Sequence, residues 1–390
     1  MERERQPSIG EVRSLRRAAW GIVALATAFP VTQANAATSP APRVVPDVGA
    51  VRVSWKAVEG ALTYSVETGR QGNLCVTTSL SCRIPLRSAD PVRFRLRTET
   101  RTSVTVSGWS YTVTPHLLVV VAGQSNALGQ ESYVIDPSTR INYFGSPFRT
   151  AADRTSRIVW LPWWTQRSAT TAWQPLTSSQ YLLSDIGRTS PIFGPEIGLA
   201  RQIWTDTRTP IWIIKGAYPN TSLAVEWSPS GGLYRSLIAS VTSRMQADAR
   251  SGTVDVLGAV YWFQGENDAL ASGSAAAYGT NLNQLLDNFT RDLPFMNGPN
   301  FVIAKPSIAA WVGYRERTTW CFDCSQLRTS DAVVRQAIDN TAATRHDCTV
   351  VDTIDLDRVT LQIHLSNRAE LELGSRLATA SESLLGLTKR

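Results

Sequence analysis

A serine between two amide side chains follows an apolar run in the sequence. Residues 119–122 lead into Gly123, Gln124, Ser125 and Asn126. A serine that follows a strand and begins a helix has its backbone N–H at the positive end of that helix. This position suits a nucleophile, because the same N–H can stabilise the oxyanion that its attack creates. A helix N-cap serine shows the same local pattern, so both interpretations stand for this motif alone.

A second polar group follows another apolar run. Residues 261–263 are succeeded by Gln264, Glu266 and Asp268. Polar side chains at the mouth of a buried strand each need a hydrogen-bond partner, whereas a surface loop would satisfy them with water. Both arrangements fit the sequence here.

The chain has three histidines, and they differ in their surroundings. His116 falls in a connecting segment, and His346 stands beside Asp347 in a polar loop. His364 follows a predicted strand and precedes a predicted helix. We therefore predict that His364 is the general base that accompanies Ser125.

From residue 116 onwards, near-continuous apolar runs alternate with helical segments. The predicted strands are residues 117–122, 210–215, 257–263, 301–305 and 349–353, and the predicted helices are 196–204, 233–249, 277–293, 331–343 and 369–385. This alternation predicts an α/β fold with a central parallel sheet that helices cover on both faces. Ligands bind such sheets at the carboxyl ends of the strands, which is where Ser125 falls.

Composition and charge restrict the class of protein. The chain has 390 residues, 43% of them hydrophobic and 18% charged, which is typical of a folded globular protein with two or more domains. Its net charge of +7 comes almost entirely from dispersed arginines, so a nucleic-acid surface is not indicated. The three histidines lie away from the Cys321-x-x-Cys324 pair in the sequence, which argues against a zinc site, and we predict neither a metal nor another cofactor.

The first 36 residues have the pattern of a signal peptide. Arginines precede the apolar run 18–29, Pro30 follows it, and Ala34-Asn35-Ala36 fits the cleavage pattern. The apolar run is too short to span a bilayer, and no later segment is suited to do so. We therefore expect export, to the periplasm or outside the cell, with no membrane attachment after cleavage. In that oxidising setting Cys75 and Cys82 could join a hairpin, and one further pair is expected among Cys321, Cys324 and Cys348.

After a linker at residues 37–44, residues 45–114 read as short strands with alternating polarity, notably 51–58, 63–69 and 93–100. This segment resembles a fibronectin type III domain, with Trp55 and Tyr64 at its core positions and SGWSYTV (107–113) as its last strand. The resemblance implies an all-β sandwich and a hairpin disulfide between Cys75 and Cys82. We expect this module to act as a spacer or to contact a glycan or a surface.

The remaining chain resembles another family closely. GQSN, GPEIG, KGAYPNTSLAVEW, WFQGENDA and HLSNRAELELG occur in the order found in sialate O-acetylesterase-like (SASA) domains, which include sixth-family acetylxylan esterases. The resemblance implies a flavodoxin-like SGNH hydrolase domain over residues 115–388. It also implies that Ser125 is the nucleophile and His364 the base. The oxyanion hole would combine the N–H groups of Ser125 and Gly194 with the Gln264 amide. Asn126, Glu266 and Asp268 would support the site.

Two positions depart from the family pattern. Leu361 stands where the family often has an aspartate that orients the histidine. Either a backbone carbonyl near Leu361 or a carboxylate from elsewhere must then orient His364, and the candidates are Glu266, Asp355 and Asp357. Pro219 and Asn220 replace two glycines that are common in the family, which would stiffen one wall of the site.

The segment between residues 131 and 191 is rich in tryptophan, with Trp160, Trp163, Trp164 and Trp173. These rings could stack on sugars beside the site or form a small satellite core. Both interpretations remain open for three of them, while AWQPL also matches a family segment and favours a structural role for Trp173.

These features together predict an exported esterase that removes O-acetyl groups from a glycan through an acyl-serine intermediate. The acetylated saccharide would be its partner, whether sialic acid, xylan or another sugar. Two alternatives remain: a general short-chain carboxylesterase or lipase on the same fold, and a glycan-binding protein without catalysis.

Overall fold

The structure is a computed structural model, and it describes residues 40–133, 141, 150–161, 172–176, 182–185, 188–318, 321, 323–359 and 363–389. The predicted signal peptide, residues 1–36, lies outside the described residues, as do Trp163, Trp164 and Leu361. Among the helices that are described, none has the length and hydrophobicity that a bilayer span requires.

The central element is a sheet of seven strands, all parallel except one at the edge. In spatial order it comprises β10 (Gln174–Pro175), β9 (Arg157–Trp160), β13 (Ile211–Ala217), β8 (His116–Gly123), β14 (Asp255–Phe263), β15 (Phe301–Lys305) and β16 (Cys348–Asp352). The five predicted strands are confirmed as β8, β13, β14, β15 and β16, whereas β9 and β10 were not predicted.

The order of these five strands locates the expected binding edge. Numbered along the chain, they lie side by side as second, first, third, fourth and fifth, which is the flavodoxin-like order. The chain winds in opposite directions from β8 towards β13 and towards β14. The carboxyl ends of β8 and β14 therefore flank the switch point, where ligands bind in sheets of this kind.

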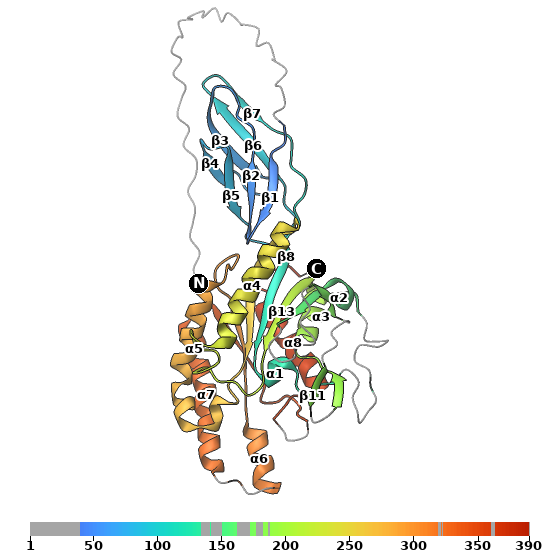
Figure 1. The fold of residues 1–390 in the computed structure, drawn as a ribbon, viewed down its shortest axis with the longest axis vertical. Helices are drawn as coiled ribbons and strands as arrows, with labels where there is room; N and C mark the ends of the chain where they lie inside the picture. Colours follow the sequence, from blue (N-terminus) through green and yellow to red (C-terminus); the bar gives the residue numbers. More distant parts are fainter. Residues whose placement is uncertain are drawn as a thin grey trace, which may run out of the picture. The chain divides into compact units, whose positions relative to one another are not determined.

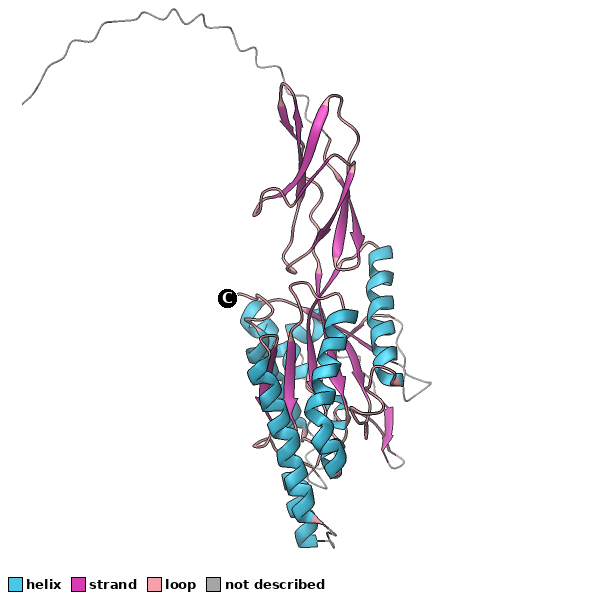
Figure 2. Ribbon diagram, turned by 90° about the vertical axis from the view of Figure 1, so that its left-hand side faces the viewer, coloured by secondary structure: helices cyan, strands magenta, loops and turns pink. Residues whose placement is uncertain are grey.

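Alternate residues of β8 face opposite helical layers. Leu118, Val120 and Ala122 pack with residues of α4 (Gly232–Arg250), α5 (Ser272–Asp292) and α7 (Cys324–Thr344). Leu117, Val119 and Val121 pack with residues of α3 (Glu196–Thr207) and α8 (Asn367–Ser381). Figures 1 and 2 show the strands with helices on both sides. Since both faces of β8 are covered, its apolar residues form a continuous run rather than an alternating one.

Shorter elements connect this framework. They are α1 (Ser125–Leu128), α2 (Ala151–Thr155), α6 (Ala309–Thr318), a 3₁₀ turn η2 (Asp268–Leu270), and the hairpin of β11 (Leu182–Asp185) and β12 (Arg188–Pro191). The five predicted helices are all present, although α7 begins at Cys324, earlier than its predicted start at residue 331. The α6 helix was not predicted.

Residues 43–106 form two antiparallel sheets. One contains β1 (Arg43–Asp47), β2 (Ala50–Ser54) and β5 (Ser81–Pro85); the other contains β4 (Cys75–Thr77), β3 (Ala61–Thr68), β6 (Phe94–Thr100) and β7 (Val104–Val106). The predicted Cys75–Cys82 disulfide is present and connects β4 with β5. Trp55 and Tyr64 are in ring contact, with centroids 5.4 Å apart.

The segment 107–113, predicted as a strand, is not a regular one. Its main chain bonds to that of β6 at separate points rather than continuously. Ser107 N–H donates to Leu96 O and Ser110 N–H donates to Phe94 O, each at 2.8 Å. In return, the Ser107 and Ser110 hydroxyls accept hydrogen bonds from Leu96 N–H and Phe94 N–H. Side-chain oxygens thus take the place of backbone carbonyls, which interrupts the ladder.

Candidate active site

Ser125 lies at the carboxyl edge of the sheet, at the point where β8 meets β14. Gly123 has φ +141°, and a Cβ there would overlap the Phe263 carbonyl. Only glycine allows this approach, and Gln124 N–H then donates to Phe263 O at 2.9 Å. Ser125 follows as the first residue of α1, with 6% of its surface exposed. The predicted position of Ser125 at a strand end and a helix start is confirmed.

Asn126 connects the serine segment to the segment that carries His364. Its amide Nδ2 donates to Glu266 Oε1 at 2.6 Å and to Ile363 O at 3.2 Å. Its Oδ1 accepts from Leu365 N–H at 2.9 Å. Asn126 is fully buried, so these bonds form away from water. The backbone on both sides of His364 is therefore held by the residue that follows Ser125.

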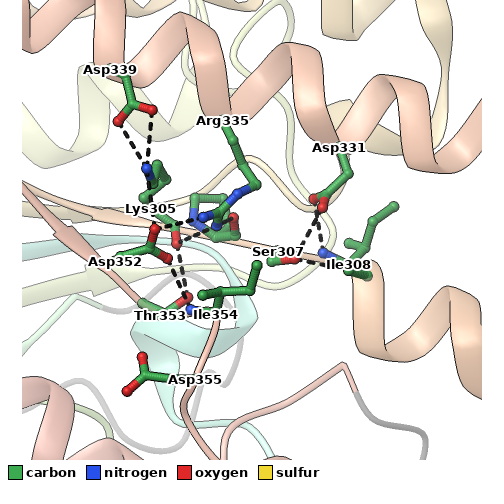
Figure 3. A network of polar contacts seen from close by, with 12 residues as sticks. Lys305, Ser307, Ile308, Asp331, Arg335, Asp339, Asp352, Thr353, Ile354 and Asp355 are labelled. Carbon is green, nitrogen blue, oxygen red and sulfur yellow. Dashed lines mark hydrogen bonds and ion pairs between the residues drawn. The ribbon is translucent and has the colours of Figure 1, made fainter.

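The segment from β16 to α8 carries His364 and is anchored along its length. At its start, Asp352 bonds Lys305 and Arg335, and the Thr353 hydroxyl donates to Lys305 O at 2.8 Å (Figure 3). Further along, Arg358 donates to Ile363 O at 3.0 Å, and Val359 N–H donates to His364 O at 2.9 Å. These contacts hold residues 353–359 and 363–366, which belong to no helix or strand.

The carboxylate beside His364 is Glu131. Its Oε2 lies 2.9 Å from His364 Nδ1, and both side chains are mostly buried. The three carboxylates suggested by the sequence were wrong for this position. Glu266 bonds Asn126, Asp355 is paired with Arg376, and Asp357 is exposed. The backbone near Leu361, the other predicted partner of His364, lies outside the described residues.

Glu131 was missed because its position depends on how short α1 is. The helix ends after one turn, and Gly129 follows in the left-handed region at φ +85°. The chain then turns back, and Glu131 itself takes φ +65°. The glycine four residues after Ser125 was the available signal, since glycine commonly ends helices.

Both remote donors predicted for the oxyanion hole have partners in this structure. Gly194 N–H donates to Glu196 Oε1 at 3.1 Å. The Gln264 amide donates to Thr221 O at 2.8 Å and to Asp268 Oδ2 at 2.6 Å, which uses both of its hydrogens. Gly194 packs so tightly that a Cβ would meet the Lys215 ammonium and the Ala127 carbonyl. Glycine is required here for packing, and the conformation does not direct its N–H into an open site.

Glu266 and Asp268 each support an amide. Glu266 is buried against Asn126, and Asp268 against Gln264. Burial raises the pKa of Glu266, while the Asn126 hydrogen bond opposes the rise. Burial also raises the pKa of Asp268 to about 6, with the Gln264 bond again opposing. Each carboxylate thus accepts a hydrogen bond from one amide, and their supporting role remains a prediction.

A buried charge cluster lies under α1. The Lys215 ammonium bonds Glu196 and donates to Leu128 O at 3.0 Å, and both charged side chains are fully buried. Burial lowers the pKa of Lys215, and the nearby Glu196 charge opposes that change. Glu370 is also fully buried, and burial raises its pKa well above the usual range. The cluster joins β13, α3 and the last residue of α1, so it fixes the turn that leads to Glu131.

The described tryptophans of the 131–191 segment belong to the core. Trp160 is 5% exposed, and its ring lies 4.3 Å from the Lys215 ammonium. Trp173 donates from Nε1 to Asp248 at 2.8 Å and packs edge-on against Trp212. These two have a structural role, but in the main core of the sheet rather than in a separate satellite core, and they do not form a sugar platform.

Asn220 accommodates the departure from glycine in the YPNTSL segment. It adopts φ +57°, a left-handed conformation that asparagine tolerates better than most residues. The backbone there can therefore take a glycine-like path. Elsewhere in the described ranges, no group of three or more His, Cys, Asp or Glu side chains is placed to hold a metal ion.

The chain is thus an α/β protein with Ser125 at the carboxyl ends of its parallel strands and the His364–Glu131 pair in a segment that Asn126 bonds. Comparison with known proteins identifies the family. The family described as "Carbohydrate esterase, sialic acid-specific acetylesterase" matches residues 115–383, and the chain belongs to this family.

Individual relatives are distant. The chain is 24% identical over 271 residues to the "Probable carbohydrate esterase" of Arabidopsis thaliana, across 69% of this chain and 91% of that protein. The solved structure of an Arabidopsis thaliana protein is 20% identical with a TM-score of 0.48, covering 69% of this chain and 98% of its own. A carbohydrate acetylesterase from Xanthomonas citri is 14% identical with a TM-score of 0.46, covering 88% of this chain and 75% of its own.

Proposed function

We propose that this carbohydrate esterase removes O-acetyl groups from a saccharide by way of an acetyl-serine intermediate on Ser125. The family supports the reaction class. The observation that carries the mechanism is the way one short segment holds His364. Asn126 bonds the backbone on both sides of this histidine, and Glu131 bonds its ring.

In this mechanism Glu131 orients the imidazole. With Nδ1–H donating to Glu131, the lone pair of Nε2 is free to accept the Ser125 proton. The Ser125 oxygen attacks the acetyl carbonyl carbon, His364 gives the proton to the departing sugar oxygen, and acetyl-Ser125 forms. A water molecule, deprotonated by His364, then attacks the acetyl group, which releases acetate and restores the Ser125 hydroxyl.

The backbone of Glu131 supports this role. Its φ of +65° is uncommon for a residue with a Cβ and costs on the order of 1 kcal/mol. Strained conformations of this kind are retained where the rest of the structure over-determines them, and they cluster at functional sites. Here the strain coincides with the residue that contacts the proposed base.

For the oxyanion we propose the Ser125 backbone N–H as the primary donor. It lies at the start of α1, where helix N–H groups have no partner within the helix. The Gly194 N–H and the Gln264 amide would contribute only after exchanging their present acceptors, Glu196 and Asp268. We therefore propose that the main role of Gln264 is to position the loop that contains Thr221.

Export to the periplasm or the extracellular space remains our proposal. Two disulfides support it, Cys75–Cys82 and Cys321–Cys324, because such bonds persist in oxidising compartments. The second bond fulfils the expectation of one pair among the three downstream cysteines and leaves Cys348 as a thiol. We further propose an SGNH-type hydrolase domain over residues 115–388 and a fibronectin type III-like module over 45–114. The two antiparallel sheets support the latter.

The test is acetate release from acetylated xylan and from O-acetylated sialic acid, with Ser125→Ala as the matched variant. We expect release from one of them, reduced by about 10³-fold or more in the variant. Labelling of the wild-type protein by a fluorophosphonate, absent in Ser125→Ala, would locate the nucleophile independently of the substrate. Equal activity in the two proteins would overturn the assignment.

A further inference from the structure

The net positive charge of the chain is concentrated in its β-rich segment. Residues 40–114 contain ten basic and five acidic residues, a net charge of +5. Residues 115–390 contain 24 of each, a net charge of zero. The part that contains the esterase site is thus neutral, while the part without the site is cationic. Such asymmetry creates a local positive potential that attracts anionic partners.

Part of this charge surrounds a groove. A cavity of about 560 Å³ lies among residues 68–71, 74, 84–88, 90–94 and 109, at the ends of β3 and β5 and the start of β6. Its charged lining residues are Arg70, Arg87, Arg93 and Asp90, and its aromatic ones are Trp109 and Phe94. Trp109 is 37% exposed, which is unusual for so large an apolar ring.

Two of the groove arginines are available to a ligand. Arg70 is paired with Asp90 at 2.8 Å. Within the described part of the chain, neither Arg87 nor Arg93 makes an ion pair with an acidic side chain. Arg93 and Arg95 lie over the Trp109 ring, with guanidinium carbons 5.9 and 4.8 Å from its centroid. Arg95 is itself paired with Glu67 and helps to hold the ring in place.

We propose that this groove binds an acidic polysaccharide whose sugars carry carboxylates. A guanidinium group donates two parallel hydrogen bonds to a carboxylate, which suits Arg87 and Arg93. Trp109, which is 37% exposed, offers an apolar surface for the adjoining sugar ring where Arg93 and Arg95 leave its ring uncovered. A polysaccharide is the occupant favoured because the chain belongs to a carbohydrate esterase family. The inference concerns binding alone and does not depend on the mechanism proposed for Ser125.

The test is electrophoresis of the whole protein through gels that contain polygalacturonate or, in parallel, a neutral glucomannan. We expect retardation by polygalacturonate only, weakening as salt is added. The double variant Arg87→Ala/Arg93→Ala should lose about tenfold or more in affinity, since two charge-assisted contacts are removed. Trp109→Ala should also bind more weakly.

The matched control is Arg43→Ala/Arg101→Ala, which removes the same charge from exposed positions outside the groove. It should bind within about twofold of wild type. Equal losses in the two double variants would mean that diffuse charge alone attracts the polymer, and no retardation at all would equally overturn the proposal. Hydrolysis of p-nitrophenyl acetate should stay unchanged in every groove variant, so failure of the groove and failure of the esterase site are distinguishable.

Discussion

Two histidine–carboxylate pairs lie at opposite ends of the central strands, one at the amino ends (the amino edge) and one at the carboxyl ends (the carboxyl edge). His116 and Asp255 are the first residues of β8 and β14, with His116 Nδ1 3.3 Å from Asp255 Oδ1. His364 and Glu131 lie beyond the carboxyl ends of the strands, 2.9 Å apart. The same two kinds of side chain thus meet at the amino edge and at the carboxyl edge, and only one of these pairs adjoins the serine segment.

Their environments differ in a way that excludes one pair from acid–base work. The His116 ring is stacked on Trp212 with centroids 3.5 Å apart, and burial lowers its pKa to about 4. Burial, together with the neighbouring Asp248, raises the pKa of Asp255 to about 9. Both groups are therefore neutral near pH 7, and a neutral carboxyl group cannot stabilise an imidazolium. The comparison teaches that a histidine beside a carboxylate becomes a candidate base only where the fold also places the pair next to a candidate nucleophile.

The two pairs should differ most in how far substitution of the histidine lowers the rate of ester hydrolysis. His364→Ala should lower kcat by about 10³-fold or more, because no other group would take the Ser125 proton. His116→Ala should leave kcat within about twofold of wild type, since a substitution away from the site does not touch the reacting atoms. The measurement is the initial rate of p-nitrophenyl acetate hydrolysis by both variants. A similar loss in both would remove the distinction between the two edges.

A smaller difference is expected for the carboxylates. Glu131→Gln keeps the size of the side chain and leaves His364 in place but removes the carboxylate, so it should lower kcat by about 10²-fold. KM should change little, because the proposed role of Glu131 is to orient His364 rather than to bind substrate. Asp255→Asn is the control and should change neither constant. Steady-state kinetics of both variants, with thermal unfolding to confirm folding, would decide. A rise in KM with unchanged kcat for Glu131→Gln would contradict the positioning role.

The sheet and the serine could be predicted because their signals are local. The continuous apolar run of β8 reflects burial on both faces, and residues 123–126 mark its end. The helices of both layers followed from their periodicity. The edge strands β9 and β10 and the helix α6 escaped prediction, because two to four strand residues, or a helix with one buried residue in ten, leave little periodic signal.

The partners within the site could not be predicted because they depend on long-range contacts. Glu131 and His364 are 233 residues apart in the sequence, and their contact requires α1 to end after one turn. The hydrogen bond from Gly194 N–H to Glu196 is likewise evident only once Lys215 of β13 is seen to pair with Glu196 of α3. Motif order identifies which segments meet at the sheet edge, whereas the orientation of each donor depends on packing.

The smallest predicted effect is on stability, and it sharpens the contrast at the amino edge. Asp255 has a pKa of about 9 in the folded chain against an ordinary value of 3.8. Between these values the folded state holds a proton that the unfolded state releases, so a rise in pH favours unfolding. His116 acts in the opposite direction below its ordinary pKa of 6.5, because there only the unfolded state is protonated until pH falls to about 4. The two contributions offset each other below pH 6.5, and the effect of Asp255 stands alone from pH 6.5 to 9.

The unfolding free energy should therefore fall between pH 6.5 and 9, by up to about 1.4 kcal/mol per pH unit from this group. Asp255→Asn has no proton to lose, so its Tm should decline less steeply over the same range. The measurement is scanning calorimetry of both proteins at one scan rate, with Asp287→Asn, an exposed carboxylate, as the matched control. Parallel Tm curves for wild type and Asp255→Asn would show that Asp255 is ionised in the folded chain. The amino-edge pair would then carry charge as well, and its lack of chemistry would rest solely on its distance from the serine segment.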